Sequence, residues 1–528
     1  MRWRNQRRCE DNAVEADLHN YLKFKLPAGY SQERLIRESS DASYSTKEEQ
    51  SATERFTIYD TFDWRLFNNS LALYGTGSHF VLHHLSQNTL IERARIRAQP
   101  VFIWDFPDSR LKDLLSPIIK VRALLKRAEI VSHSNSYRIL NPDEKTVARF
   151  VYEAFRLKPD APAMSTHLTL EQVRGYPAYF RTLANQFHDL GFPTVGEEDI
   201  YRNILGAVNQ NPGDYSTKLK LKLDPDMRAD EATKIVLRFL LKVINRNVEG
   251  IKADLDTEFL HDFRVAIRRT RSALSQIKSV FPEDAIDRFR REFAALGKLS
   301  NPLRDLDVYL LNERSYKAML PNVFQVDIEP LFDHLRVKRS EALKEVVGNL
   351  NSKRLSRMLK DWEAFLDEPS KNTSPALNAG VPIIFLARKR IYRRYRKVVK
   401  LGRLSFENTG DELLHQLRIE CKKLRYLMEF FSSLFPYPKI SILINQLKNL
   451  QDNLGDFQDV CIQDEYLQTI TGELPIANSQ SKRTILAIGS LIGALSQKKQ
   501  TVKNSFSNIF NDFASASNRK LFRELFAS

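Results

Sequence analysis

Basic side chains recur at a helical spacing in two short stretches of the chain. The first row comprises His261, Arg264, Arg268 and Arg271, and the second row, 154 residues later, comprises His415, Arg418, Lys422 and Arg425. Positions three and four residues apart return to one face of an α-helix, so each row predicts a stripe of positive charge along its helix. Arg offers a forked donor to phosphate oxygens, Lys a point charge and His a further donor. These residue types favour binding of an anion with closely spaced charges.

The offset of 154 residues relates positions well beyond the two rows. Upstream, Lys234, Lys242 and Arg246 pair with Arg388, Arg396 and Lys400. Downstream, Asp305 pairs with Asp459, each 44 residues after the His that opens its row. These two carboxylates could act as an acid and a base, but holding the Arg side chains of the rows is the role that we expect. The sequence therefore predicts a duplicated helical unit.

The distribution of charge indicates which part of the chain meets the anion. The formal net charge of the 528 residues is +16. Residues 1–225 carry 31 Lys and Arg against 28 Asp and Glu, whereas the remaining residues carry 50 against 37. A positive excess of this kind attracts nucleic acid, an anionic membrane or polymeric phosphate, and the charge alone does not choose among them.

The cysteines and the apolar stretches indicate the compartment. Cys9, Cys421 and Cys461 are too few and too scattered for a disulfide framework or a zinc site. The longest apolar run, near residues 485–495, is far below the ~20 residues that cross a bilayer, and the first residues lack the apolar core of a signal peptide. We expect a soluble, cytoplasmic protein.

The N-terminal part of the chain predicts antiparallel β-structure with some helix. Residues 17–26 alternate between apolar and polar side chains, as strands do. Further strands are predicted at residues 56–59, 71–74, 80–85, 128–132, 137–140 and 147–155. A polar stretch at 38–54 predicts a loop, and helices are predicted at about 108–118 and 170–190.

The remainder of the chain predicts helices only. Turn-forming residues between 192 and 227 indicate a domain boundary, and from Ala229 onward apolar residues recur at helical spacing. The segment 369–382, rich in Pro, Ser and Asn, separates the two copies of the repeat.

The doubled motif of the rows, with an Asp 44 residues after each His, resembles that of the CHAD family, the conserved histidine α-helical domain. The resemblance covers residues 228–528. It implies two four-helix bundles related by pseudo-twofold symmetry, with a basic central channel that binds inorganic polyphosphate. By position, both rows would line this channel. The resemblance also implies weaker candidates on the preceding helices, namely Lys234, Lys242, Arg388 and Arg396.

Residues 59–66 (Tyr-Asp-Thr-Phe-Asp-Trp-Arg-Leu) and the strand order around them resemble the CYTH family of triphosphate tunnel enzymes. Those enzymes hold metal with a Glu-x-Glu-x-Lys strand, whereas the best-placed strand here offers Asp17, His19 and Tyr21. His83-His84 stands where a Lys is expected. This departure predicts a degenerate tunnel without a metal site or catalytic residues.

Several basic residues beside the motifs are explained without a role in ligand binding. Arg269 and Lys423 point about 100° away from the rows, so they are either surface charges or partners of acidic neighbours. The basic run at 393–397 predicts a solvated helix face. Tyr392 and Tyr395, which lie among these arginines, are also typical of nucleotide stacking, although core packing is expected for Tyr395.

The sequence thus predicts an α+β protein with a degenerate CYTH-like domain at residues 1–200, a linker at 201–227, and a CHAD-like domain at 228–528 with repeats 228–370 and 382–528. Its predicted function is non-catalytic binding of inorganic polyphosphate, without a cofactor, in a basic channel between the repeats. The alternatives are a metal-dependent triphosphate or polyphosphate hydrolase in the N-terminal tunnel, and an RNA-binding protein. No membrane partner is expected, the protein could be associated with polyphosphate granules, and the oligomeric state stays open.

Overall fold

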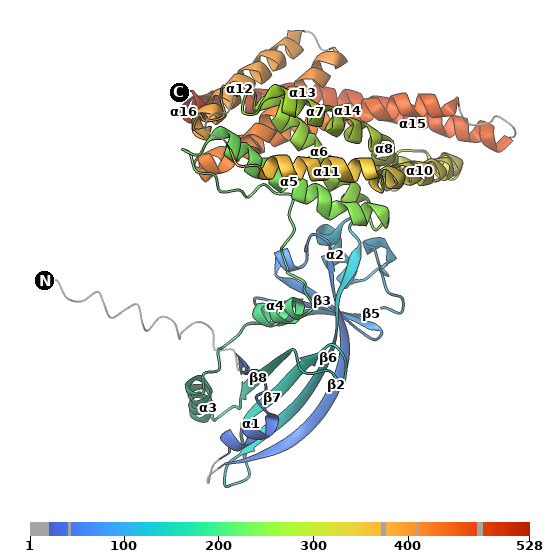
Figure 1. Cartoon of the computed structure of the whole chain (residues 1–528). Helices are drawn as coiled ribbons and strands as arrows, with labels where there is room; N and C mark the ends of the chain where they lie inside the picture. The colour runs from blue at the N-terminus through green and yellow to red at the C-terminus, as the bar shows by residue number, and fades with distance from the viewer. Residues whose placement is uncertain (1–20, 41–43, 371–375, 408–409, 473–478, 528) are drawn as a thin grey trace. The chain divides into compact units, whose positions relative to one another are not determined.

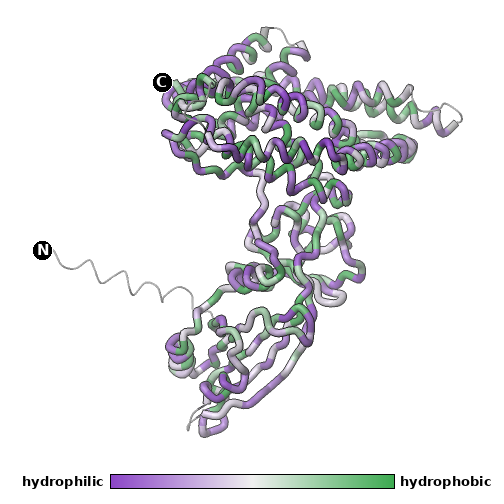
Figure 2. The backbone as a smooth tube through the Cα atoms, viewed as in Figure 1, coloured by the Kyte–Doolittle hydropathy of each residue, from purple (hydrophilic) through white to green (hydrophobic). Residues whose placement is uncertain are grey.

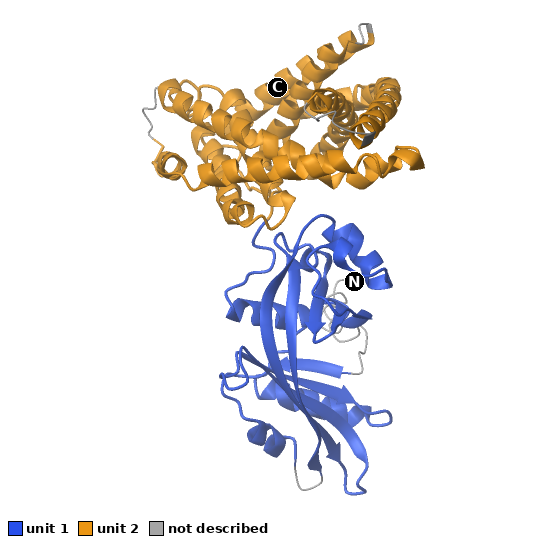
Figure 3. Ribbon diagram, turned by 90° about the vertical axis from the view of Figure 1, so that its right-hand side faces the viewer, with its two compact units in different colours: residues 1–215 blue, residues 216–528 orange. Residues whose placement is uncertain are grey.

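The computed structural model describes residues 21–40, 44–370, 376–407, 410–472 and 479–527 of the chain. The chain forms two compact units, unit 1 at residues 1–215 and unit 2 at residues 216–528 (Figure 3). Their boundary falls inside the predicted linker at 201–227. Unit 1 is built on an antiparallel sheet and unit 2 on helices, so the predicted α+β class is confirmed.

The sheet of unit 1 is an antiparallel, curled half-barrel with the strand order β1-β8-β7-β6-β2-β3-β4-β5 (Figure 1). The described strands are β1 (Tyr21–Lys25), β2 (Ser45–Thr61), β3 (Leu71–Thr76), β4 (His79–His84), β5 (Thr89–Arg95), β6 (Leu124–Leu140), β7 (Thr146–Arg156) and β8 (Ser165–Gln172). The long strands β2 and β6 pair along their whole length, from Ser45 opposite Leu140 to Thr61 opposite Leu124. Register shifts in this pair, at Glu48/Gln50 and Ile58/Tyr59, are irregularities of the kind that bend a sheet.

Helices pack on this sheet and complete its core. They are α1 (Gln32–Glu38), α2 (Arg110–Ile119), α3 (Pro177–Asp189) and α4 (Glu197–Ala207). Phe180 and Phe187 of α3 are buried with Phe150 of β7 and Leu168 of β8. α4 places Ile200, Tyr201 and Ile204 in a second cluster.

One predicted element in unit 1 is wrong, and another begins later than predicted. The predicted loop at 38–54 is largely the outer half of β2, whose side chains are mostly exposed. Its backbone hydrogen bonds to β6 hold it in place, so the pattern of apolar burial that identifies strands is missing there. The predicted helix at 170–190 begins at Pro177, because residues 170–172 belong to β8. Residues 17–20 of the first predicted strand lie outside the described part.

Unit 2 repeats its helices at the sequence offset of 154 residues. The first repeat contains α5 (Ala229–Lys252), α6 (Thr257–Gln276), α7 (Glu283–Leu299), α8 (Asn301–Leu311), α9 (Glu313–Ala318), α10 (Glu329–Leu350) and α11 (Lys353–Asp367). The second contains α12 (Ile383–Glu407), α13 (Asp411–Phe430), α14 (Tyr437–Thr471), α15 (Ser479–Phe513) and α16 (Ala516–Phe526). The helices α5, α6 and α7 begin 154 residues before α12, α13 and α14.

The two repeats differ where α14 is continuous and its counterpart is broken into α7 and α8. Pro302 stands at the start of α8, and the aligned residue in α14 is Asp456. Proline has no backbone N–H, and its ring clashes with the carbonyl of the residue four positions earlier, so the helix is interrupted before it. The first repeat therefore has a bend where the second has a straight helix.

The apolar faces of the two repeats share one core. Tyr309 of α8 and Leu331 and Phe332 of α10 are buried in the same cluster as Leu467 of α14 and Leu491 of α15. The helices of unit 2 alternate between hydrophilic and hydrophobic residues along their length (Figure 2), as expected for helices with one buried face. The repeats are thus packed together rather than linked in series.

Candidate functional site

The two basic rows lie on α6 and α13, which contact each other. Each helix is anchored by apolar residues on the neighbouring edge, for example Phe263 and Ile267 on α6 and Leu417 and Leu424 on α13, all buried. Hydrogen bonds span the contact. They include those from Nε of Arg268 to the hydroxyl of Tyr426 (2.9 Å) and from Nε2 of Gln276 to the carbonyl oxygen of Lys423 (3.1 Å). The helix packing therefore brings the first row close to the second.

The positive charges of the two rows act on one another. Burial is the largest cause that lowers the pKa of Lys422, to about 7, and the charges of Arg418 and Arg268 lower it further. The pKa of Arg418 is also lowered. Burial is the largest cause, Asp459 acts in the opposite direction, and the charge of Arg268 lowers the pKa further. In the first row, burial lowers the pKa of Arg264 to about 10, and Arg268 contributes. Arg268 is thus close enough to influence cations of both rows.

The paired carboxylates Asp305 and Asp459 lie beside these cations. Nη2 of Arg418 donates to Oδ1 of Asp459 (3.2 Å). Burial raises the pKa of Asp305, the charge of Arg264 lowers it, and Asp459 raises it, so the two aspartates are near each other as well. This position supports the predicted role of holding arginines. The same electrostatic network includes the cations Arg264, Arg268, Arg418 and Lys422, so these two carboxylates leave positive charge in excess.

The last arginines of the two rows, Arg271 and Arg425, differ in their surroundings. Nε of Arg425 donates to Glu429 (2.7 Å), and its Nη1 donates to Gln451 (2.9 Å). In the first repeat the aligned positions are Ser275 and Gly297. Arg271 is exposed and makes no ion pair with a carboxylate of the described residues. At this duplicated position, the arginine of the second row is therefore held by neighbouring side chains, whereas the arginine of the first row is exposed.

Arg264 has a structural task that its counterpart Arg418 does not share. Its Nη1 donates to the carbonyl oxygen of Gly297 (3.2 Å) and to Oγ of Ser300 (2.9 Å), at the break between α7 and α8. The guanidinium thus occupies backbone and hydroxyl acceptors at the end of α7. In the second repeat, the unbroken α14 leaves Arg418 to pair with Asp459.

The two histidines open the rows from the N-terminal halves of their helices. His415 is hydrogen bonded through Nδ1 to Oε1 of Gln458, the residue before Asp459. His261 is partly exposed on α6. Both positions agree with a place at the end of each row.

Among the described hydrogen bonds and ion pairs, none joins the four weaker candidates to the rows. The ammonium group of Lys234 is bound to the carbonyl oxygen of Glu368 and lies 5.5 Å from the ring centroid of Phe365. Lys242 is exposed on α5, Arg388 is partly buried on α12, and Arg396 is exposed on α12. Lys234 is thus a buried residue that holds the end of α11.

Residues beside the rows stabilise the contact between repeats. Arg269 is buried and donates to Glu429 (2.7 Å) and to the carbonyl oxygen of Thr217 (2.8 Å). Lys423 pairs with Glu420 (3.0 Å), so both cations are partners of acidic neighbours, one of the two expected roles. Sequence reasoning missed Tyr426 and Glu429, which are recognisable only once the contact between α6 and α13 is known.

Tyr395 packs in the core, as expected. Its ring stacks on that of Phe522, with centroids 3.7 Å apart. The side chain is buried, so it offers no free face to a nucleotide base.

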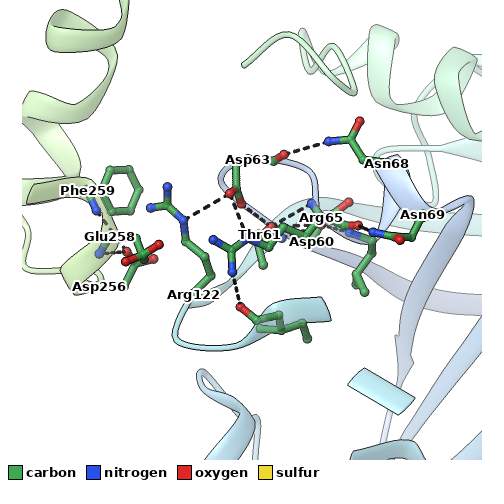
Figure 4. Close-up of polar contacts among 12 residues, drawn as sticks. Asp60, Thr61, Asp63, Arg65, Asn68, Asn69, Arg122, Asp256, Glu258 and Phe259 are labelled. Carbon is green, nitrogen blue, oxygen red and sulfur yellow. Dashed lines mark hydrogen bonds and ion pairs between the residues drawn. The ribbon is translucent and has the colours of Figure 1, made fainter. Parts of the chain in front are cut away.

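In unit 1, the acidic residues of the segment 59–66 fold a turn (Figure 4). Asp60 is buried and accepts from the backbone N–H groups of Thr61 (2.7 Å), Leu66 (3.0 Å) and Phe67 (2.9 Å). Asp63 pairs with Arg65 (2.9 Å) and Arg122 (3.5 Å). The contacts of these carboxylates are therefore those of a structural turn.

The lysines of β1 are held by α4. Lys23 pairs with Glu197, and Nζ of Lys25 donates to Oδ1 of Asn203 (3.3 Å). His83 packs edge-on against Tyr74, and burial lowers its pKa. Among the described residues, no three His, Cys, Asp or Glu side chains form a group that could hold a metal ion. Asp17 and His19 lie outside the described residues.

Comparison with known proteins assigns the helical unit to a family. Residues 235–468 match the family model of the CHAD domain. Uncharacterized proteins from two strains of Mycobacterium tuberculosis are each 28% identical to the chain over 294 residues, which are 54% of this chain and 52% of theirs. The chain thus spans about half the length of these curated relatives. No described helix combines the length and apolar character needed to cross a membrane.

Two solved structures are similar to part of the chain. The CHAD domain from the plant Ricinus communis aligns with a TM-score of 0.46 and 23% identity, over 56% of this chain and 94% of that one. PptA from Streptomyces chartreusis aligns with a TM-score of 0.42 and 16% identity, over 54% of this chain and 100% of that one. The antiparallel sheet of unit 1 is consistent with the expected CYTH-like fold. The family match at residues 235–468, which contains both basic rows, shows that unit 2 belongs to the CHAD domain family.

Proposed function

We propose that unit 2 binds inorganic polyphosphate along the two basic rows without turning it over. The observation that carries the proposal is the position of Arg268, which binds Tyr426 of the second repeat and whose charge acts on Arg418 and Lys422. Burying like charges together is unfavourable, so an anion that bridges the rows would be bound strongly.

The surroundings of the rows favour a phosphate chain over a nucleic acid. A helical row presents a cation about every 5.4 Å turn, a spacing that suits a thin polymer with one charge per phosphate. Single-stranded nucleic acids are typically held by exposed aromatic platforms as well. Tyr426, the aromatic residue that contacts the first row, is buried, and its hydroxyl is already bound to Arg268.

The contacts of the carboxylates support a non-catalytic role. Asp459 is bound to Arg418, and Asp305 lies in the field of Arg264, so both act on arginines of the rows. In unit 1, the lysines of β1 bind side chains of α4, contacts with which a triphosphate would compete. In this proposal the protein acts in the cytoplasm by holding or organising polyphosphate.

A titration of the full chain tests this function. The double variant Arg268→Glu/Arg271→Glu changes two exposed residues of the first row, and Lys344→Glu/Lys360→Glu makes the same change of charge at exposed positions of α10 and α11. We expect the row variant to bind long-chain polyphosphate about tenfold or more weakly and the control variant to bind nearly as the natural protein does. Circular dichroism checks that both variants fold.

Three outcomes would overturn the proposal. They are equal affinity in the row variant, tighter binding of RNA than of polyphosphate at equal phosphate concentration, and release of phosphate in the presence of Mg²⁺ or Mn²⁺.

A further inference from the structure

Unit 2 has a second concentration of positive charge, in a cavity of about 1300 Å³ along α12. Eight of the described residues that line it are Lys or Arg, and none of them is Asp or Glu. Besides α12, the end of α6 contributes Ser275 and Gln276, followed by Lys278. Such a set of like charges around a hollow is typical of a binding site for an anion.

Five of the eight cations of this cavity lie on α12 at positions that are apolar in the first repeat. The aligned positions on α5 carry apolar residues: Lys389, Arg390, Arg393, Arg394 and Lys397 correspond to Ile235, Val236, Phe239, Leu240 and Val243. Of the five apolar residues, Val236, Leu240 and Val243 are buried. Most of the basic face of α12 is therefore specific to the second repeat, whereas Arg396 and Lys400 are matched by Lys242 and Arg246 in the first.

A single carboxylate partly compensates the charge. Glu420 of α13 is buried and pairs with Arg394 and Lys397. Arg390 donates to the carbonyl oxygen of Lys278 (3.3 Å), its Nε is buried without a hydrogen-bond partner, and burial, Arg393 and Arg394 lower its pKa.

Five exposed cations of the cavity are left without such compensation. They are Lys278, Lys389, Arg393, Arg396 and Lys400. None of them forms an ion pair with a carboxylate in the described part of the chain. The expected solvated face at 393–397 is thus divided between residues fixed by Glu420 and residues open to a ligand.

The cavity continues the line of the first row. Arg268, Arg271, Ser275 and Lys278 follow one another at three- and four-residue spacing, and the last two line the cavity. Along a helix, four residues advance about 6 Å, so a flexible polymer bound at Arg271 can reach Ser275. The row and the cavity are therefore neighbouring parts of one surface.

We propose that the α12 cavity is a second binding site for a phosphate chain, which a long polyphosphate occupies together with the rows. The inference rests on the proposed function and adds a preference for chain length. A polymer that reaches both sites gains affinity because the second contact forms at high effective concentration. Tripolyphosphate is too short to gain in this way.

The test compares long-chain polyphosphate with tripolyphosphate on the full chain. Lys389→Glu/Arg393→Glu alters two exposed cations of the cavity, and Arg268→Glu/Arg271→Glu alters the row. We expect the cavity variant to lose about tenfold in affinity for the long chain while its affinity for tripolyphosphate stays unchanged. The row variant should lose affinity for both, and Lys344→Glu/Lys360→Glu for neither.

The possible failures are distinguishable. If the cavity variant binds the long chain like the natural protein while the row variant does not, the second site is refuted and the function of the rows stands. If only the cavity variant loses polyphosphate, the cavity is a site and the rows are not. If the cavity variant loses RNA binding but keeps polyphosphate, the cavity serves nucleic acid and the inference is refuted. Circular dichroism and thermal unfolding verify that each variant is folded.

Discussion

Arg268 and Lys422 occupy the same position in the two copies of the motif, and their charges interact across the contact between α6 and α13. Burial brings the pKa of Lys422 to about 7, with further contributions from Arg418 and Arg268. Asp459 acts in the opposite direction, and Arg425 adds to the lowering. The protonation of Lys422 is therefore sensitive to whether an anion is bound.

Polyphosphate binding should weaken as the pH rises above about 7. A bound anion favours the charged ammonium group and raises its pKa, so binding takes up a proton wherever the free protein has released it. Calorimetric titrations between about pH 6 and about pH 9 in buffers with different ionisation enthalpies measure this uptake. Lys422→Arg, which stays charged, should have a smaller pH dependence. The same dependence in both proteins would contradict the prediction.

The stability of the free protein should show the reverse trend. Unfolding returns the pKa of Lys422 from about 7 to the ordinary lysine value of 10.5, so between these values the unfolded chain binds the proton that the folded protein has released. The contribution of Lys422 to the free energy of unfolding therefore rises with pH across this window. Urea unfolding of the natural protein and of Lys422→Met at several pH values isolates the contribution. A difference between them that does not change with pH would contradict it.

Arg271 and Arg425 should separate binding from stability. Arg271→Ala removes an exposed cation, so we expect weaker polyphosphate binding and a change in unfolding free energy within about 0.5 kcal/mol. Arg425→Ala removes the partner of Glu429 and Gln451, so it should lower the unfolding free energy by about 1 kcal/mol or more. Denaturant unfolding and calorimetric titration of both variants make the comparison. Equal effects of the two variants on stability would show that the contacts of Arg425 contribute little.

Gly297→Gln should transfer the bound state of Arg425 to Arg271. A Cβ atom at residue 297 would lie 3.3 Å from Nη1 of Arg271, the flexible end of that side chain. Gln is also a better helix former than Gly, by roughly 0.5–1 kcal/mol. We expect a folded protein of equal or higher stability that binds polyphosphate more weakly, while Gly297→Ala, which lacks the amide, should bind more tightly than Gly297→Gln. Unchanged affinity in Gly297→Gln would indicate that Arg271 does not contact the ligand.

Asp60→Ala should destabilise unit 1 and leave polyphosphate binding intact. The buried carboxylate accepts three backbone hydrogen bonds, and removing it leaves those N–H groups without an acceptor, at a cost of roughly 1–3 kcal/mol for each that stays unsatisfied. Thermal unfolding followed alongside a polyphosphate titration tests both parts. Loss of binding at a temperature where unit 2 is folded would mean that the ligand also needs unit 1.

Sequence reasoning could find the rows because the duplication doubles the signal, and the family match confirms the CHAD assignment. It could not find the outer half of β2, whose exposed polar residues are held by backbone pairing. The contact of buried Lys234 with the carbonyl oxygen of Glu368 could not be predicted either, because its alignment with Arg388 does not indicate whether the lysine is buried or exposed. The roles assigned to the row residues stay predictions.

One difference between the repeats was within reach of the sequence. Aligning the neighbours of Arg271 and Arg425 pairs Ser275 with Glu429 and Gly297 with Gln451, which indicates that only the second arginine has partners. The basic cavity of α12 was harder to predict, because a run of Arg and Lys on a helix does not reveal that Lys278 and the end of α6 close around it.

Because the helix is interrupted at Pro302 in the first repeat only, identical residues at aligned positions of the two repeats have different structural roles. Arg264 hydrogen bonds to the end of α7, where the helix is interrupted before Pro302. Arg418 lies beside the continuous helix α14 and pairs with Asp459 instead. The duplication therefore predicts where a residue of one repeat lies from its counterpart in the other, but it does not predict the role of that residue. If mutational effects were averaged over the two repeats, the loss of folding stability caused by substituting Arg264 would be mistaken for a loss of ligand binding.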